Sequence, residues 1–139
     1  MLDFTSKFGQ RVNGRLQREQ IIWLTTVDSD NTPLPRPVWF HWDGETVLIF
    51  SEGDTAKLWH IERNPKVSLN FNTDEEGGDV AVLLGETRVL EEPPAQTRVK
   101  AYLRKYKEGL EDLDTTPDEF MGLYSVAILV TPHSMQGFV

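Results

Sequence analysis

Short apolar runs separated by turn-forming residues dominate the sequence. Five of them cover residues 21–27, 36–42, 46–51, 66–72 and 80–90. Several alternate apolar with polar side chains, which is the pattern of a strand with one buried face. Most connections are short turns, among them "DSDNTP", "DG" and "TDEEGGD", and Asp-Gly is a strong hairpin signal. Strands joined so closely predict an antiparallel sheet or barrel.

Helical patterns interrupt these strands without alternating regularly with them. The first 20 residues carry one apolar stripe at four-residue spacing: Phe4, Phe8, Val12 and Leu16. Further helices are predicted over residues 55–63 and 94–110, and Thr116-Pro117 with Glu119 forms a capping box that starts another. Residues 124–132 return to strand. We therefore predict a single α+β domain over residues 1–139, mainly β, with flanking helices.

Composition excludes several classes of protein. With 139 residues the chain is long enough for one core, and it has no cysteine for disulfides or a thiolate nucleophile. A net charge of −8 argues against nonspecific binding to nucleic acid or anionic membranes. The N-terminus is polar, unlike a signal peptide, and no apolar run approaches the roughly 18 to 20 residues that span a bilayer. We expect a soluble, cytoplasmic protein.

Familiar catalytic motifs are missing. The histidines at 41, 60 and 133 form no H-x-x-x-H or H-E-x-x-H pair, which leaves only a composite metal site open. The sequence contains neither a G-x-S-x-G elbow nor a glycine-rich phosphate loop of the two common kinds. Nothing nominates a side-chain nucleophile or general acid. A chain of this kind can borrow its chemistry from a cofactor, which needs an anion anchor and a flat wall.

The stretch "SEGDTAKLWHIERNP" contains a candidate anion anchor. Thr55 is placed to cap a helix whose first N–H groups and positive dipole end favour an anion. Lys57 adds a full charge in the first turn, and the hydroxyls of Ser51 and Thr55 add donors. The alternative from these residues alone is that Lys57 is an ordinary surface lysine.

The stretch "PRPVWF" contains a candidate wall for a planar ring. Pro35 and Pro37 fix φ and cannot donate ladder hydrogen bonds, as expected of an edge strand. Trp39 either stacks on the ring or packs in the core. A second cationic region, residues 98–107, is either a solvated helix face or the rim of an anion site.

Taken in order, "PVWF", "DG", "TAKLWHIERNP" and "GGD" resemble the pyridoxamine 5'-phosphate oxidase-like split β-barrel proteins, over about residues 20 to 90. Within them the chain looks most like the flavin/deazaflavin (F420)-dependent oxidoreductases. The resemblance implies an antiparallel split β-barrel and a homodimer with two cofactor sites at the subunit interface. It implies F420 as the preferred cofactor and FMN as the other candidate, with hydride transfer to a small conjugated organic substrate and no catalytic side chain.

The resemblance also implies roles for two groups of residues. The cofactor phosphate would be held by Ser51, Thr55, Ala56 and Lys57. The ring would lie beside Arg36, Pro37, Val38 and Trp39. The longer anionic tail of F420 would benefit from further cations, from residues 98–107 or from Arg63 and Lys66.

One departure from the vitamin B6 oxidases of this fold is the C-terminal segment. Here it reads "TPHSMQGFV", without the basic residues that bind the substrate in those enzymes, so pyridoxal phosphate synthesis is disfavoured. Two other functions stay open on the same barrel: a non-catalytic flavin, F420 or haem carrier, for which a histidine would ligate the haem iron, and a purely structural dimer.

Overall fold

A computed structural model describes residues 2–139. Its helices are α1 (Lys7–Arg18), α2 (Ala56–Arg63), α3 (Gln96–Lys105), α4 (Lys107–Asp112) and α5 (Pro117–Leu123). Its strands are β1 (Ile22–Val27), β2 (Pro33–Val38), β3 (His41–Trp42), β4 (Val47–Ser51), β5 (Lys66–Asn70), β6 (Val80–Val89) and β7 (Val126–Phe138). The strands form one sheet in the order β2-β1-β5-β6-β7-β4-β3.

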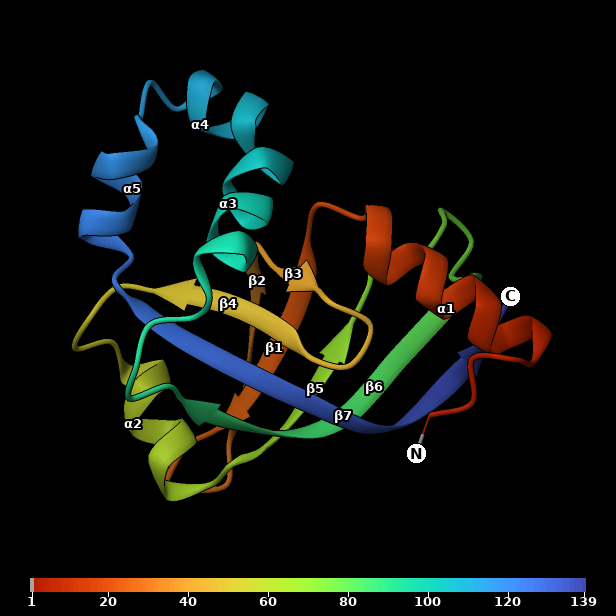
Figure 1. Cartoon of the computed structure of the whole chain (residues 1–139). Coiled ribbons are helices and arrows are strands. Elements are labelled where there is room, and N and C mark those ends of the chain that lie inside the picture. The colour runs from red at the N-terminus through yellow and green to blue at the C-terminus, as the bar shows by residue number, and fades with distance from the viewer. Residues whose placement is uncertain (1) are drawn as a thin grey trace.

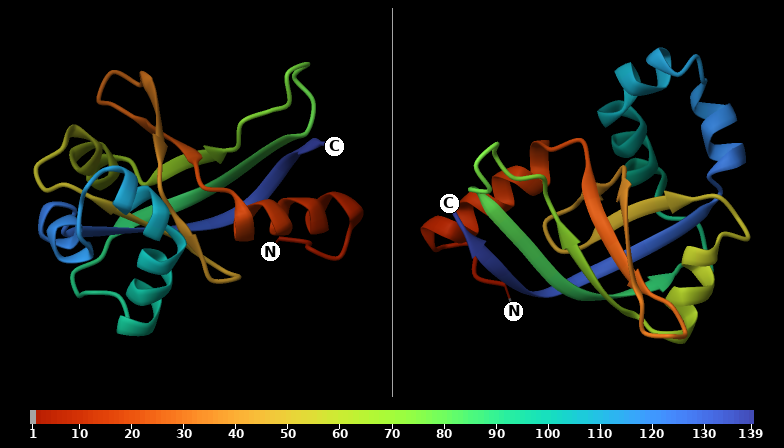
Figure 2. Two further views of the ribbon diagram at one scale, coloured as in Figure 1. Left: turned by 90° about the horizontal axis from the view of Figure 1, so that it is seen from above. Right: turned by 180° about the vertical axis from the view of Figure 1, so that it is seen from behind.

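The sheet is antiparallel and curled into a half-barrel (Figures 1 and 2). The predicted fold class, an antiparallel split β-barrel with flanking helices, is thus confirmed. The two longest strands, β6 and β7, shift register at Leu84/Gly85. A Cβ at Gly85 would lie 2.5 Å from the carbonyl oxygen of Thr131, so glycine lets the two backbones approach closely at this irregularity.

The predicted strand over residues 36–42 is wrong as a continuous element. It ends at Val38, and the chain resumes pairing only at His41, on a different partner. The two pieces, β2 and β3, lie at opposite ends of the strand order. Trp39 and Phe40 therefore cross from one edge of the sheet to the other, where neither residue has a strand partner.

Phe40 finds its backbone partners in side chains of α3. The Phe40 N–H donates to the Tyr106 hydroxyl (2.8 Å), and that hydroxyl donates to the carbonyl of Gln20 (2.7 Å) or Phe40 (3.1 Å). The Lys105 ammonium donates to the Phe40 carbonyl (2.8 Å) and lies 3.6 Å from the centroid of the Phe40 ring. These bonds satisfy buried polar groups that the sheet leaves without partners.

Two apolar clusters form on either side of β4. Val47 and Ile49 face the barrel interior with Phe40, whereas Leu48 and Phe50 face α3, α4 and α5. All five residues of β4 are buried, because helices cover the face that an antiparallel strand often exposes to water. We call residues Gln96–Leu123, with α3, α4 and α5, the helical arch; it rises from one end of the sheet in Figure 1.

The predicted helices are present with corrected bounds, except that one of them is broken in two. The helix expected within residues 1–20 is α1, with Val12 and Leu16 of its stripe fully buried. The single helix expected over 94–110 is wrong: it breaks at Tyr106 into α3 and α4. The capping box at Thr116 and Glu119 is present. The last strand starts at Val126 and runs to Phe138, beyond the predicted end at 132.

Replacing Tyr106 with phenylalanine should destabilise the fold. The ring packing stays, but the buried Phe40 N–H loses its acceptor, which costs about 1–3 kcal/mol. Urea unfolding measures this cost. Tyr124→Phe is the control, because the Tyr124 hydroxyl, unlike that of Tyr106, does not bond the backbone of Phe40 or Gln20. Equal stability of wild type and Tyr106→Phe would contradict the bridging role.

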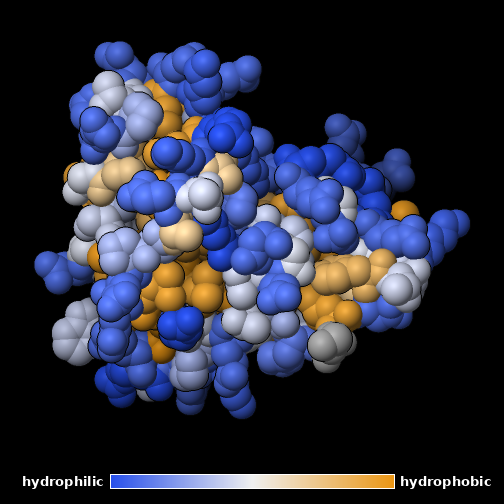
Figure 3. Space-filling model, viewed as in Figure 1, coloured by the Kyte–Doolittle hydropathy of each residue, from blue (hydrophilic) through white to orange (hydrophobic). Residues whose placement is uncertain are grey.

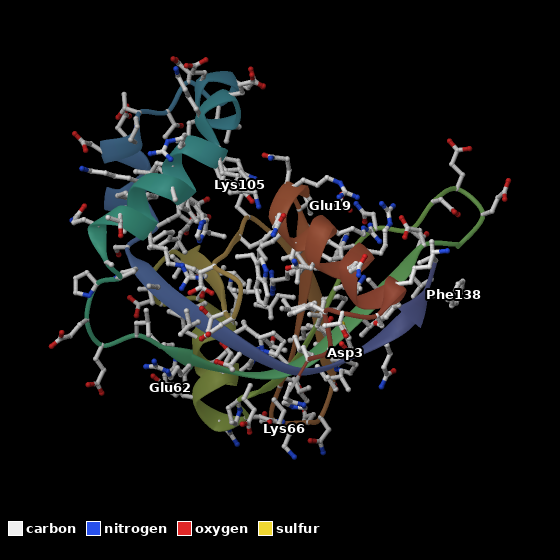
Figure 4. All side chains as sticks on the ribbon, turned by 45° about the vertical axis from the view of Figure 1, so that its right-hand side comes forward. Asp3, Glu19, Glu62, Lys66, Lys105 and Phe138 are labelled. Atoms are coloured by element: carbon white, nitrogen blue, oxygen red, sulfur yellow. The ribbon has the colours of Figure 1, made fainter. Side chains whose placement is uncertain are left out.

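Lys105 should make stability depend on pH. Burial lowers its pKa from 10.5 to about 8, against the opposing charge of Glu19, which lies on the same side of the molecule (Figure 4). At pH values between about 8 and 10.5 the unfolded chain binds more protons than the folded one. The free energy of unfolding therefore rises with pH, because the folded protein no longer has to bury a charged Lys105. The difference in unfolding free energy between wild type and Lys105→Met should therefore grow in favour of wild type from pH 7.5 to pH 10. A difference that stays constant over this range would contradict the assignment.

Candidate functional site

A cavity of about 550 Å³ lies between the barrel and the helical arch. From the barrel side it is lined by Ile21, Pro37, Val38, Trp39 and Phe50, and from α2 by Lys57. From the arch and its end it is lined by Tyr102, Leu110, Leu113, Thr115, Phe120, Leu123 and Tyr124. We call it the arch cavity. Figure 3 shows apolar side chains in the space between the helices of the arch.

Lys57 is the charged side chain of the arch cavity, and a second cation lies near it. The pKa of Lys57 is lowered, first by burial and then by the positive charge of Arg36, while Glu52 acts in the opposite direction. Among the described residues neither Lys57 nor Arg36 forms a salt bridge. A bound anion would stabilise the charge of Lys57, which burial and Arg36 disfavour and Glu52 only partly compensates.

The start of α2 adds hydrogen-bond donors at this end. Thr55 is the N-cap residue, so the amides of Ala56 and Lys57 have no carbonyl of their own helix to bond. The expected side-chain cap is absent: the Thr55 hydroxyl lies 3.4 Å from the Ser51 hydroxyl instead. Ser51 in turn donates to the carbonyl of Glu52 (3.0 Å). The hydroxyls of Ser51 and Thr55 and the N–H groups of Ala56 and Lys57 thus belong to one short segment of the chain that ends at Lys57.

The predicted site residues fall into two sets. Pro37, Val38, Trp39 and Lys57 line the arch cavity. Arg36, Ser51, Thr55 and Ala56 do not line it, although Arg36 acts on Lys57 electrostatically and the other three precede it in the chain. The two predicted stretches, far apart in sequence, are therefore brought together at one end of the cavity.

Trp39 is packed against rings of the helical arch. Its indole lies nearly parallel to the rings of Tyr106 (4.3 Å between centroids, 3°) and Phe120 (5.6 Å, 19°). A Cβ at Gly109 would approach the Trp39 ring to 3.2 Å, so α4 also lies against it. Trp39 thus forms a wall of the cavity and is held in place by the arch.

The open edge of β2 has a specific hydrogen-bonding character. Pro33, Pro35 and Pro37 alternate along this edge strand, which pairs with β1 alone. Since proline has no N–H, the donors for that ladder come from the residues between the prolines, and the prolines turn to the outer edge. That edge therefore offers carbonyl acceptors and no N–H donors beside the cavity.

Sequence reasoning missed the arch side of the cavity. Phe120 and Tyr124 carry no motif, and they reach the site only because α5 folds back over β4. Glu52 lies close enough to Tyr124 to raise the pKa of its phenol, although burial raises it more. The one available signal was the aromatic content of residues 102–124, which the capping box at Thr116 placed on a helix.

The cationic side chains of residues 98–107 do not line the cavity. Arg98 is used inside the fold: it bonds His41 and Thr46 and forms a salt bridge with Asp43 (3.1 Å). Lys105 bonds Phe40, as described above. Lys100, Arg104 and Lys107 are exposed, as are Arg63 and Lys66, and none of these five lines the arch cavity.

Two kinds of feature are absent from residues 2–139. No group of three or more histidine or carboxylate side chains is arranged to hold a metal ion. Within the same residues, no helix has both the length and the apolar character needed to cross a bilayer.

The curled antiparallel sheet with its flanking helices is a split β-barrel. A model of the pyridoxamine 5'-phosphate oxidase family matches residues 8–134, and the chain belongs to that family. No protein of curated function matches the sequence.

Several solved structures share the fold. A pyridoxamine 5'-phosphate oxidase candidate from Listeria innocua is 23% identical, with 91% of this chain and 94% of that chain covered and a TM-score of 0.67. An F420 reductase is also 23% identical, with 89% and 94% covered and a TM-score of 0.66. The heme storage protein of Vibrio cholerae is 14% identical, with 95% of both chains covered and a TM-score of 0.64. At these identities the likeness concerns the fold.

Anion binding at Lys57 should be lost as pH rises. Because the pKa of Lys57 lies below that of an ordinary lysine, its charge disappears at a lower pH, and affinity for an anion should fall with it. Calorimetric titration with pyrophosphate from pH 7 to 10 measures this fall. Lys57→Arg should keep the affinity at high pH, whereas Lys66→Arg, an exposed lysine of β5, should behave as wild type. The same pH profile in Lys57→Arg and wild type would contradict the site.

Proposed function

We propose that this protein is an oxidoreductase that transfers a hydride between a bound F420 or FMN and a small conjugated organic substrate. The observation that carries the proposal is Lys57, the one charged side chain among the described residues that line the cavity, with the positive charge of Arg36 acting on it from outside the lining. A phosphate-bearing cofactor with a flat ring has the matching distribution of charge. The family and its F420 reductase neighbour support the same chemistry.

The anionic end of the cofactor would be held at the start of α2. Lys57 and Arg36 supply charge, and the free amides of Ala56 and Lys57 point along the helix dipole toward an anion. The hydroxyls of Ser51 and Thr55 lie within the same turn and are 3.4 Å apart. This set suits a phosphate or phosphodiester, since the amides of Ala56 and Lys57 have no acceptor within their own helix and charged oxygens accept strong hydrogen bonds.

The ring would lie along Pro37, Val38 and Trp39. The outer edge of β2 offers only carbonyl groups, which accept hydrogen bonds from ring N–H groups and repel ring carbonyls. Trp39, held by Tyr106 and Phe120, keeps this wall rigid and excludes water. When bound, the cofactor supplies the hydride chemistry, so the chain needs to bind, orient and desolvate and not to supply a nucleophile.

We further propose that the chain acts in the cytoplasm as a homodimer with cofactor sites at the subunit interface. The support is the resemblance of the stretches around residues 35–40 and 51–65 to family members. F420 is preferred over FMN on the same likeness. Its tail would find few cations beyond Arg36 and Lys57, since the other exposed ones lie off the cavity.

A titration of the cofactor-free protein with F420 and, separately, with FMN tests the proposal. We expect one of the two cofactors to bind tightly, as measured by fluorescence and calorimetry. In Lys57→Ala the affinity for that cofactor should fall by at least about tenfold. Lys66→Ala is the matched control and should bind as wild type. Binding of FMN alone would reverse the cofactor preference, and binding of neither would refute the function.

The alternative is a haem carrier on the same barrel. One observation favours it: the Nδ1 of His60 is buried and has no hydrogen-bond partner. His41 is a poorer ligand because its Nδ1 accepts a hydrogen bond from Arg98 (3.1 Å), and His133 is exposed. Titration with hemin distinguishes the two functions: a haem carrier would give a histidine-ligated visible spectrum that His60→Ala abolishes.

A further inference from the structure

We propose that the arch side of the arch cavity binds a neutral, apolar substrate that contains a planar ring. This inference rests on the proposed function, which assigns the Lys57 end of the cavity to the cofactor phosphate. It adds the class of substrate that the arch side of the cavity would bind, argued from the charge and shape of the lining and from the entrance.

The charge of the lining selects a neutral molecule. Of the residues that line the cavity, Lys57 is the one charged side chain in the described chain, and it stands at the α2 end. The arch contributes apolar side chains with only the hydroxyls of Thr115 and two tyrosines among them. A charged substrate buried against these helices would lose its hydration and find no opposite charge, which is costly.

The shape of the lining selects a flat ring. The rings of Trp39, Phe120 and Tyr124 follow one another nearly in parallel: Trp39 to Phe120 is 5.6 Å at 19°, and Phe120 to Tyr124 is 4.7 Å at 18°. Rings stacked on one another in this way present their edges to the cavity, and the face of an aromatic or quinone-like ring gains edge-to-face and apolar contact there.

The entrance is apolar as well. Leu113, after α4, and Leu123, in α5, both line the cavity and yet are 64% and 62% exposed. Large apolar side chains left in water at the mouth of a cavity gain free energy when an apolar ligand covers them. The other strongly exposed apolar residues, Trp59, Phe138 and Val139, do not line this cavity.

The test compares two ligands that share a ring and differ in charge, 2-naphthol and naphthalene-2-sulfonate. Each is titrated calorimetrically into the protein loaded with whichever of F420 or FMN it binds. We expect 2-naphthol to bind at least about tenfold more tightly than the sulfonate.

Changes at the entrance provide the second arm. The double variant Leu113→Lys with Leu123→Lys should weaken 2-naphthol binding about tenfold and leave cofactor affinity unchanged. Both positions are exposed, so the fold should be retained, as circular dichroism and thermal unfolding check. Phe138→Lys is the matched control and should bind both ligands as wild type.

The outcomes separate the two proposals. Equal or tighter binding of the sulfonate, unchanged 2-naphthol binding in the double variant, or displacement of the cofactor by 2-naphthol would overturn the substrate class. If neither cofactor binds, the proposed function fails, and the same two titrations on the cofactor-free protein still decide the substrate class.

Discussion

The interaction on which the structure depends is the set of hydrogen bonds that the Tyr106 hydroxyl and the Lys105 ammonium make with the backbone of Phe40. At Trp39 and Phe40 the chain leaves one edge of the sheet and has not yet joined the other, so its polar groups have no ladder. Because α3 supplies those partners, the sheet can stay open at this point without burying unpaired groups. The same contacts fix the helical arch over β4 and hold Trp39 where the arch cavity begins.

Charge is distributed unevenly over this frame. The acidic surplus lies outside the cavity lining, while Lys57 lines the cavity and Arg36 lies near enough to lower its pKa. Cations elsewhere are used differently: Arg98 ties the arch to the β3–β4 turn, and Lys105 is buried against Phe40. A chain with a net charge of −8 can therefore still present a local anion site, because the site depends on two side chains and a helix end.

Particular residues show how far sequence reasoning reaches. The strands predicted over residues 66–72 and 80–90 are present as β5 (Lys66–Asn70) and β6 (Val80–Val89), and the pattern Thr116-Pro117 with Glu119 predicted the start of α5. The same reasoning joined 36–42 into one strand and 94–110 into one helix, both wrongly. In each case the periodicity continues through the break. Each element is interrupted where it meets a residue distant in sequence. The side chain of Tyr106 bonds the backbone of Phe40, and the helix breaks at Tyr106.

The apolar periods, the turn residues and the helix caps predicted an antiparallel sheet or barrel with flanking helices, since these are local preferences of the backbone, and the family resemblance narrowed this to a split barrel. The stretches containing Lys57 and Arg36 were likewise visible as a possible anchor and wall. Only the tertiary structure could bring them together, add Phe120 and Tyr124 across from them, and leave Leu113 and Leu123 at the entrance. Those placements follow from how the arch packs on β4, and packing between distant segments leaves no periodic signal in either of them.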